Sequence, residues 1–398
     1  MHTLEDLHSG ALAGARHVRL TAQGLRQFPR QLFTLADTLE VLDLSGNQLA
    51  ALPDDLHRLH RLRILFASNN PFTTLPPALG ACPQLEMVDF KACAITQVPA
   101  ASLPARLRWL ILTDNQLQQL PDSLGQRPRL QKLMLSCNQL DRLPDLSACT
   151  RLELLRLASN RFTQLPDSVL QLPALCWLAL AGNPMTRHSE QTVLGQVQHT
   201  LPHDRLAIGT LLGEGASGQI FAAVDTATGQ ALALKRFKAG QTSDGTPQSE
   251  LAAGLRAGRH PHLLTPLARV DGLADGALAT ALPLLSPDYS PLAGPPDFDS
   301  CTRDVYPPAS VLTSAQAQAL ITDIGSAVQH LHAHGIVHGD LYAHNVLWNR
   351  HNGHALLSDF GAAGLTDDLP RAQVQQLQQI EGRAFAHLEQ ELRSRVSA

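Results

Sequence analysis

The pattern LxxLxLxxN, with a few apolar replacements, recurs through the first half of the chain. Its copies start at Leu39, Leu62, Leu85, Leu107, Leu130, Leu152 and Leu175, at intervals of 22 or 23 residues. A degenerate earlier copy runs from Val18 to Pro29. A unit this short offers one strand whose leucines face inward, and it cannot bury them alone. The repetition therefore predicts a solenoid in which neighbouring units stack around a continuous core.

The last position of the pattern is polar in every copy. It reads Asn47, Asn70, Cys93, Asn115, Asn138, Asn160 and Asn183. An amide side chain at each turn can bind backbone groups of adjacent units, so we expect these residues, Cys93 included, to be structural. On this spacing, the first half of the chain resembles the leucine-rich-repeat family.

Residues between the repeat leucines are expected on the concave face, because alternate strand positions point in opposite directions. One such column reads Val41, Ile64, Met87, Trp109, Lys132, Leu154 and Trp177, and the next reads Asp43, Phe66, Asp89, Ile111, Met134, Arg156 and Ala179. An exposed apolar stripe with tryptophans favours a binding surface, for a protein partner or for the C-terminal half itself. The alternative is that strands simply prefer bulky residues. The stripe comprises Ile64, Met87, Trp109, Leu154 and Trp177.

Composition excludes several classes of protein. The formal net charge of −4 gives no basic field for nucleic acid, and the six cysteines are scattered without a CxxC pair. That cysteine pattern suits a reducing compartment. The sequence shows neither a secretory signal nor an apolar run long enough to span a membrane. A cytoplasmic location is therefore expected, with no nucleic-acid partner and no membrane span.

A different pattern begins at Leu206. A strand-like segment leads into Gly213, Gly215 and Gly218, and two further strand-like segments follow, the second ending at Lys235. Glycines between strands allow the backbone to close over the phosphates of a nucleotide. The chain has only four lysines, so a lysine at this position is informative. Glu250 opens the next predicted helix and is the candidate ion-pair partner of Lys235.

Two further motifs carry oxygen ligands and a candidate base. The segment HGDLYAHN, residues 338–345, contains Asp340 and Asn345, and Asp359 begins a DFG sequence. Asp340 suits a base or an orienting group for an acceptor hydroxyl, and Asn345 and Asp359 offer hard oxygen ligands for Mg²⁺. A helix capped by Ser314 is predicted over residues 315–334, ending at Gly335.

Together these motifs make the C-terminal half similar to the protein-kinase family, and the whole chain similar to bacterial leucine-rich-repeat protein kinases. The resemblance implies a serine/threonine kinase that uses ATP and Mg²⁺. It implies Asp340, Lys235 and Glu250 as catalytic residues, and Asn345 and Asp359 as metal ligands. It implies nucleotide contacts from Leu212, Gly213, Gly215, Gly218, Ile220, Ala233 and Lys235.

The chain departs from the kinase pattern at three places. Gly339 replaces the arginine that usually grips an activation-loop phosphate, so activity should not depend on that switch. Tyr342 stands where serine/threonine kinases usually carry lysine, and a phenol offers only one neutral hydrogen bond. Only 37 residues follow Gly361, and they read as one long helix, so the lobe is expected to be shortened.

The predicted fold class is multidomain: an α/β leucine-rich-repeat solenoid followed by an α+β bilobal kinase-like domain. The predicted boundaries are 1–190 for the repeats, 191–203 for a linker and 204–398 for the kinase-like domain. Two other functions stay open. One is a nucleotide-binding pseudokinase scaffold, and the other is a small-molecule kinase, because HGDxxxxN also resembles aminoglycoside and choline kinases. Serine/threonine against tyrosine specificity is also open.

Overall fold

In the computed structural model, residues 2–215, 217–239, 242, 244–308 and 310–397 are described. The chain divides into two compact units. The first contains residues 1–155 and 160–175, and the second contains residues 156–159 and 176–398. The boundaries expected from sequence, at residues 190 and 204, remain a prediction.

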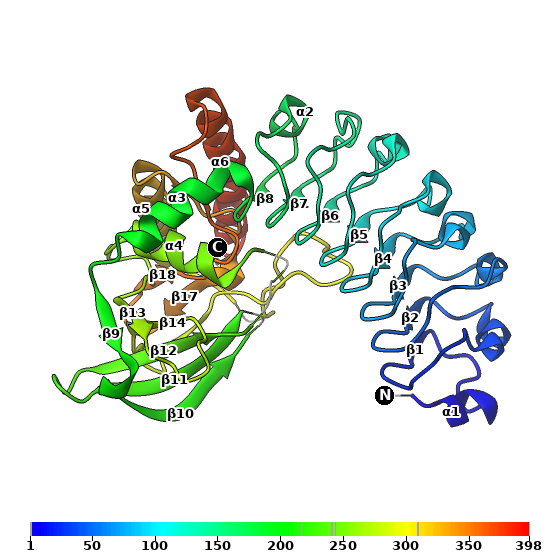
Figure 1. Ribbon diagram of the computed structural model, residues 1–398, viewed down its shortest axis with the longest axis horizontal. Helices are drawn as coiled ribbons and strands as arrows, with labels where there is room; N and C mark the ends of the chain where they lie inside the picture. Colours follow the sequence, from blue (N-terminus) through cyan, green and yellow to red (C-terminus); the bar gives the residue numbers. More distant parts are fainter. Residues whose placement is uncertain (1, 216, 240–241, 243, 309, 398) are drawn as a thin grey trace. The chain divides into compact units, whose positions relative to one another are not determined.

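The repeats form short parallel strands on the inner side of an arc, with turns outside (Figure 1). In the described residues, the strands pair in chain order from β1 to β8. Their bounds are β1 His17–Arg19, β2 Val41–Asp43, β3 Ile64–Phe66, β4 Met87–Asp89, β5 Trp109–Ile111, β6 Lys132–Met134, β7 Leu154–Arg156 and β8 Trp177–Ala179. The degenerate first copy thus supplies β1, as predicted. The outer turns include α1 (Leu4–His8), α2 (Asp167–Leu170) and five 3₁₀ turns, Arg30–Leu35, Leu56–Arg58, Pro77–Ala81, Ala100–Ser102 and Asp122–Gln126.

The polar ladder has the structural role expected of it. Asn115 accepts a hydrogen bond from the backbone N–H of Ile95 at 3.0 Å and donates to the carbonyl oxygens of Phe90 and Leu112. Cys93 sits on the same ladder, and its thiol contacts the carbonyl oxygen of Ala67 at 3.6 Å. Each unit therefore satisfies backbone groups of the unit before it, which is what keeps buried turns stable.

The apolar stripe is not exposed, so that part of the prediction is wrong. Adjacent strands are in register and pack these side chains on one another, with the Lys132 ammonium 4.1 Å from the centre of the Trp109 ring. Neighbours at the strand spacing of about 4.8 Å leave large side chains little free surface. Relative exposures are 4% for Ile64, 3% for Met87, 9% for Trp109, 2% for Leu154 and 2% for Trp177.

The smaller lobe of the second unit is built on a mixed sheet. In the described residues the strand order is β10-β11-β12-β14-β13-β9. Their bounds are β9 Thr200–Pro202, β10 Leu206–Glu214, β11 Gly218–Asp225, β12 Ala231–Phe237, β13 Ala268–Asp271 and β14 Ala279–Pro283. Alternate apolar residues such as Leu234 and Ala281 build its core. Helix α4, Pro247–Ala257, and helix α3, Pro184–Gly195, pack on one another.

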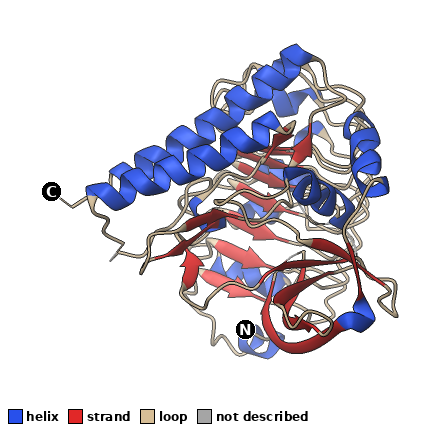
Figure 2. Ribbon diagram, turned by 90° about the vertical axis from the view of Figure 1, so that its left-hand side faces the viewer, coloured by secondary structure: helices blue, strands red, loops and turns tan. Residues whose placement is uncertain are grey.

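The larger lobe rests on two long helices that lie side by side, α5 (Ser314–Ala333) and α6 (Arg371–Arg393) (Figure 2). The Phe385 ring of α6 lies where Gly325 leaves space on α5. The cap of α5 is Thr313 rather than the predicted Ser314, because Thr313 forms a capping box with Gln316. Short strands complete the lobe: β15 Tyr289–Pro291, β16 Ile336–Val337, β17 Val346–Asn349, β18 Ala355–Leu357 and β19 Gly364–Leu365.

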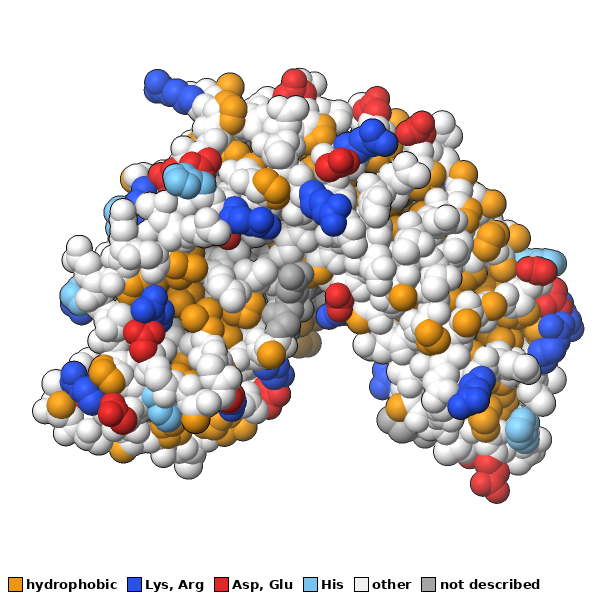
Figure 3. Space-filling view, in the orientation of Figure 1, with side chains coloured by type: hydrophobic (Ala, Val, Ile, Leu, Met, Phe, Trp, Pro, Cys, Tyr) orange, Lys and Arg blue, Asp and Glu red, His pale blue; other side chains and the backbone are white. Residues whose placement is uncertain are grey.

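The long final helix was predicted correctly. Leu377, Ile380, Leu388 and Leu392 lie on its buried side, as the apolar spacing requires. On the face drawn in Figure 3, positive and negative side chains are interspersed over both units without a continuous field of one sign. Among the described residues, no helix is both long and apolar enough to cross a membrane.

Candidate active site

A cavity of about 320 Å³ lies between the small-lobe sheet, α4 and the DFG segment. Lys235 extends into it from β12, and its ammonium forms an ion pair with the Glu250 carboxylate in the first turn of α4. Both side chains are largely buried. A buried lysine paired with one carboxylate keeps its charge and a fixed position, which suits it to bind an anion.

The cavity brings together only some of the residues expected to contact nucleotide. Its lining includes Gly215, Gly218, Ile220, Lys235 and Asp359. Leu212, Gly213 and Ala233 lie outside that lining. Leu212 is 53% exposed on β10, and Ala233 is buried within β12. Of the predicted nucleotide contacts, Gly215, Gly218, Ile220 and Lys235 therefore line the cavity, and the other three do not.

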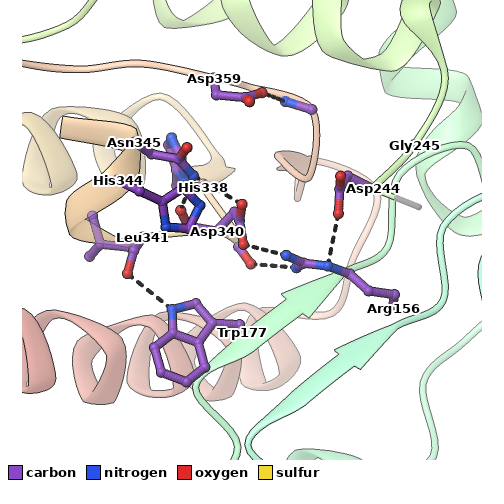
Figure 4. Close-up of polar contacts among 12 residues, drawn as sticks. Arg156, Trp177, Asp244, Gly245, His338, Asp340, Leu341, His344, Asn345 and Asp359 are labelled. Atoms are coloured by element: carbon purple, nitrogen blue, oxygen red, sulfur yellow. Dashed lines mark hydrogen bonds and ion pairs between the residues drawn. The ribbon is translucent and has the colours of Figure 1, made fainter. Parts of the chain in front are cut away.

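Asp340 and Asn345 lie in the loop between β16 and β17 (Figure 4). Asn345 donates through its side-chain nitrogen to the backbone carbonyl and to Oδ2 of Asp340, both at 2.9 Å. These contacts use the amide nitrogen, so the amide oxygen stays available for a cation. The backbone carbonyl of Asn345 also accepts from Ser358 N and Oγ at 2.9 and 2.8 Å, which ties this loop to the DFG segment.

Asp359 adopts a backbone conformation that is uncommon for a residue with a side chain. Its φ is +61°, and its Oδ1 accepts a hydrogen bond from the Gly361 N–H at 3.0 Å. A left-handed conformation costs an aspartate about 1 kcal/mol or more, and such strain clusters at functional sites. A side chain on Gly361 would come within 3.1 Å of that same Oδ1. The DFG sequence therefore orients the carboxylate toward the cavity.

Arg156 is a site residue to which the sequence assigned no role. This last residue of β7 belongs to the second compact unit and is only 3% exposed. It donates to the Gly339 carbonyl at 2.9 Å, forms an ion pair with Asp340, and lies 2.9 Å from Oδ1 of Asp244 (Figure 4). The one available signal was that Arg156 is the single basic residue of its concave-face column among the seven complete repeats.

Trp177 contacts the same loop. Its indole N–H donates to the Leu341 carbonyl at 3.0 Å, and its ring stacks on Tyr342 with centroids 4.2 Å apart. Tyr342 is 5% exposed, and its hydroxyl has no hydrogen-bond partner among the described residues. In the part of the chain that the structure describes, the Tyr342 side chain therefore interacts through its stacked ring and not through its hydroxyl.

Gly339 has no room for a side chain. Its φ is +70°, and a Cβ there would lie 2.6 Å from the Ala362 carbonyl oxygen and 2.7 Å from that of Leu178 in β8. Its N–H donates at 2.9 Å to the buried Glu381 of α6. The sequence offered a weak signal for Glu381, a carboxylate on the apolar side of a helix. An arginine at this position would therefore clash with the carbonyl groups of Ala362 and Leu178.

Charges around Asp340 set its protonation state. Burial alone would raise the pKa of Asp340, but Arg156 and then His344 outweigh it and hold the pKa below its ordinary value. For Glu250, burial prevails over the opposing effect of Lys235 and raises the pKa. Burial, followed by the Asp340 charge, raises the pKa of Tyr342, so the phenol stays neutral. The site thus contains an ionised Asp340 beside a neutral Tyr342.

Comparison with known proteins agrees with these motifs. The family described as protein kinase domain matches residues 206–378, and the leucine-rich-repeat family matches residues 38–59 and 61–82. The chain contains a protein kinase domain. It also contains leucine-rich repeats, so the predicted multidomain fold class is confirmed.

Similar curated proteins are kinases. Cell division control protein 2 homolog 3 of Trypanosoma brucei brucei is 29% identical over 162 residues, which cover 40% of this chain and 47% of that protein. Serine/threonine-protein kinase PknH of Mycobacterium bovis is 32% identical over 161 residues, covering 40% and 24%. The chain therefore spans less than half the length of these two relatives. A solved leucine-rich-repeat protein of Leptospira interrogans is 27% identical and covers 42% of this chain and 48% of its own, at a TM-score of 0.35.

Proposed function

We propose that this protein is an ATP- and Mg²⁺-dependent protein kinase that phosphorylates serine or threonine. The observation that carries the proposal is the grouping at one cavity of the Lys235–Glu250 ion pair and the Asp359 carboxylate. Asp340 and Asn345 are hydrogen-bonded to each other in the adjoining loop. Sequence similarity to serine/threonine kinases over the same region supports the choice of acceptor.

The residues divide the chemistry among them. Bound ATP with Mg²⁺ would supply the phosphoryl group and neutralise part of its charge. Lys235, held by Glu250, would bind phosphate oxygens from β12. Asp340 would orient the acceptor hydroxyl and take its proton, since it lies in a loop fixed by Asn345 and Glu381. Gly215 and Gly218 would allow the backbone between β10 and β11 to approach the phosphates.

The donor set fits magnesium. Asn345 and Asp359 offer oxygen atoms, which Mg²⁺ prefers, and two protein ligands suffice because Mg²⁺ keeps waters and substrate phosphates as its other ligands. Among the described residues, no cluster of three or more histidine, cysteine or acidic side chains could hold a metal by itself. We therefore propose a metal bound jointly by these two residues and the nucleotide.

For the repeats, we propose recognition of a protein partner, since stacked repeats offer an extended concave surface. Within the predicted stripe, Ile64, Met87, Trp109 and Leu154 would contribute mainly through the packing that shapes this face, because they are buried. We also propose a cytoplasmic location and a bacterial origin. The proposed domain limits are 1–190 and 204–398, with 191–203 as the linker.

Transfer of label from γ-labelled ATP tests the proposal. The full chain should label a protein acceptor or itself, and Asp340→Asn should lose that activity. Lys235→Met should lose nucleotide binding in a thermal-shift titration, because Lys238, the nearest other lysine, pairs with Glu214. Unchanged ATP affinity in Lys235→Met would exclude Lys235 as the residue that binds ATP at this cavity. Transfer of label to an aminoglycoside or to choline, instead of to a protein, would indicate a small-molecule kinase.

One observation favours a second function, a nucleotide-binding scaffold without transfer. Tyr342 replaces a charged residue and is buried against Trp177, so this position supplies no cation to the reaction. ATP binding that depends on Lys235, with no label transferred to any acceptor, would establish the scaffold.

A further inference from the structure

The loop that contains the candidate catalytic aspartate has no permanently charged cation of its own. Its sequence from His338 to Asn345 is HGDLYAHN, without lysine or arginine. Phosphoryl transfer concentrates negative charge, and enzymes stabilise that charge mainly with fixed cations and metal ions. The guanidinium that pairs with Asp340 comes from a distant part of the sequence, Arg156 at the end of β7.

Arg156 is built into this position. Its guanidinium donates to the Gly339 carbonyl at 2.9 Å and pairs with the Asp340 carboxylate. It also lies 2.9 Å from Oδ1 of Asp244, which lines the cavity just before α4. The side chain is 4% exposed, so its charge is screened little by solvent. Arg156 thus links the aspartate loop to the segment that leads to Glu250.

Asp340 is held from both sides. One carboxylate oxygen is paired with Arg156, and the other accepts from Asn345 at 2.9 Å. Two donors on two oxygens fix the plane of a carboxylate, whereas one donor leaves it free to rotate. A guanidinium suits this role because its planar set of N–H groups reaches a carbonyl and a carboxylate together.

Trp177 fixes the next part of the loop. Its indole N–H donates to Leu341 and its ring covers Tyr342, the position that lacks the usual charge. The backbone of β8 fills the space that a side chain at Gly339 would need. The repeat segment therefore supports the loop at Gly339, Asp340, Leu341 and Tyr342.

We propose that Arg156 is a positioning residue for phosphoryl transfer, a cation from the repeat segment that orients Asp340 and replaces the charge missing at Tyr342. This inference rests on the proposed kinase function. It makes the end of the repeats part of the catalytic unit, whereas the sequence alone suggested a recruitment module joined by a linker.

The experiment compares three variants of the full chain. Arg156→Met removes the charge, Arg156→Lys keeps it, and Arg205→Met is the matched control, since Arg205 forms an arginine–aspartate pair with Asp225 elsewhere in the same unit. We expect Arg156→Met to lower kcat by about 100-fold with the KM for ATP changed by no more than about threefold. Arg156→Lys should recover about tenfold of that loss, and Arg205→Met should match the wild type.

Hydrogen exchange of residues 338–346 gives a readout that does not depend on activity. We expect these amides to exchange about tenfold faster in Arg156→Met and to stay unchanged in Arg205→Met. If Arg156→Met does not fold, Trp177→Phe serves instead. It keeps an aromatic ring on Tyr342 but loses the donor to Leu341, and it should also accelerate exchange.

The outcomes are distinct. Higher activity in Arg156→Met would mean that the arginine blocks Asp340, which overturns the proposal. Unchanged kcat with unchanged exchange overturns it as well. If the wild type binds ATP but transfers no phosphate, the proposed kinase function fails, and the exchange data still decide whether Arg156 positions the loop.

Discussion

Replacing Gly339 with alanine tests how closely β8 approaches the aspartate loop. Alanine at φ +70° costs about 1–2 kcal/mol from the left-handed backbone alone. The added Cβ would also lie 2.6 and 2.7 Å from two backbone carbonyl oxygens, which cannot move as a side chain can. Overpacking of this kind costs about 1–3 kcal/mol more. We expect a total destabilisation of about 2–5 kcal/mol.

Gly353→Ala is the matched control. Gly353 has φ +80° in the turn between β17 and β18, and among the described residues nothing lies within 4 Å of its hypothetical Cβ. The free energy of unfolding of Gly353→Ala should fall only by the cost of the left-handed backbone, about 1–2 kcal/mol. In calorimetry, a difference of about 2 kcal/mol corresponds to about 4–8 °C in Tm for a unit of this size. Equal shifts in the two variants would refute the close packing of β8 on the loop.

Three further predictions follow from buried groups in the same unit. Tyr342→Phe should raise the free energy of unfolding by about 1 kcal/mol in denaturant titration, because the buried hydroxyl has no hydrogen-bond partner among the described residues; a loss of stability would contradict this. Activity should survive phosphatase treatment, because Gly339 provides no side chain to read a phosphate; complete loss on treatment would contradict this. Burial lowers the pKa of His344, but the hydrogen bond and charge of Asp304 outweigh it and raise the pKa above its ordinary value. The pair therefore stabilises the folded state fully below about pH 6.5, and this contribution is lost as pH rises through the raised pKa. Unfolding midpoints from about pH 6 to 9 should therefore fall more steeply in the wild type than in His344→Gln, and parallel curves would exclude that linkage.

Local sequence determined the elements that repeat or follow a fixed spacing. The leucine period determined strands β1 to β8, because a unit of 22 or 23 residues can bury its leucines only by stacking on its neighbours. The apolar spacing of the final helix determined which side of α6 is buried. The Lys235–Glu250 ion pair was also predicted, because each partner stands at a recognisable position on its own element.

Tertiary structure alone decided the surroundings of Asp340. Arg156 and Asp340 are separated by 184 residues, and no local pattern connects a concave-face arginine to a loop aspartate. The apolar stripe on the concave face was predicted to be exposed because no local pattern shows what packs against it. Sequence indicates which way a strand residue points, but burial depends on what packs against it, as Tyr342 does against Trp177. The missing arginine at Gly339 could be read from the sequence, whereas the lack of room for a side chain there is visible only in the folded chain, where a Cβ would lie 2.7 Å from the Leu178 carbonyl oxygen of β8.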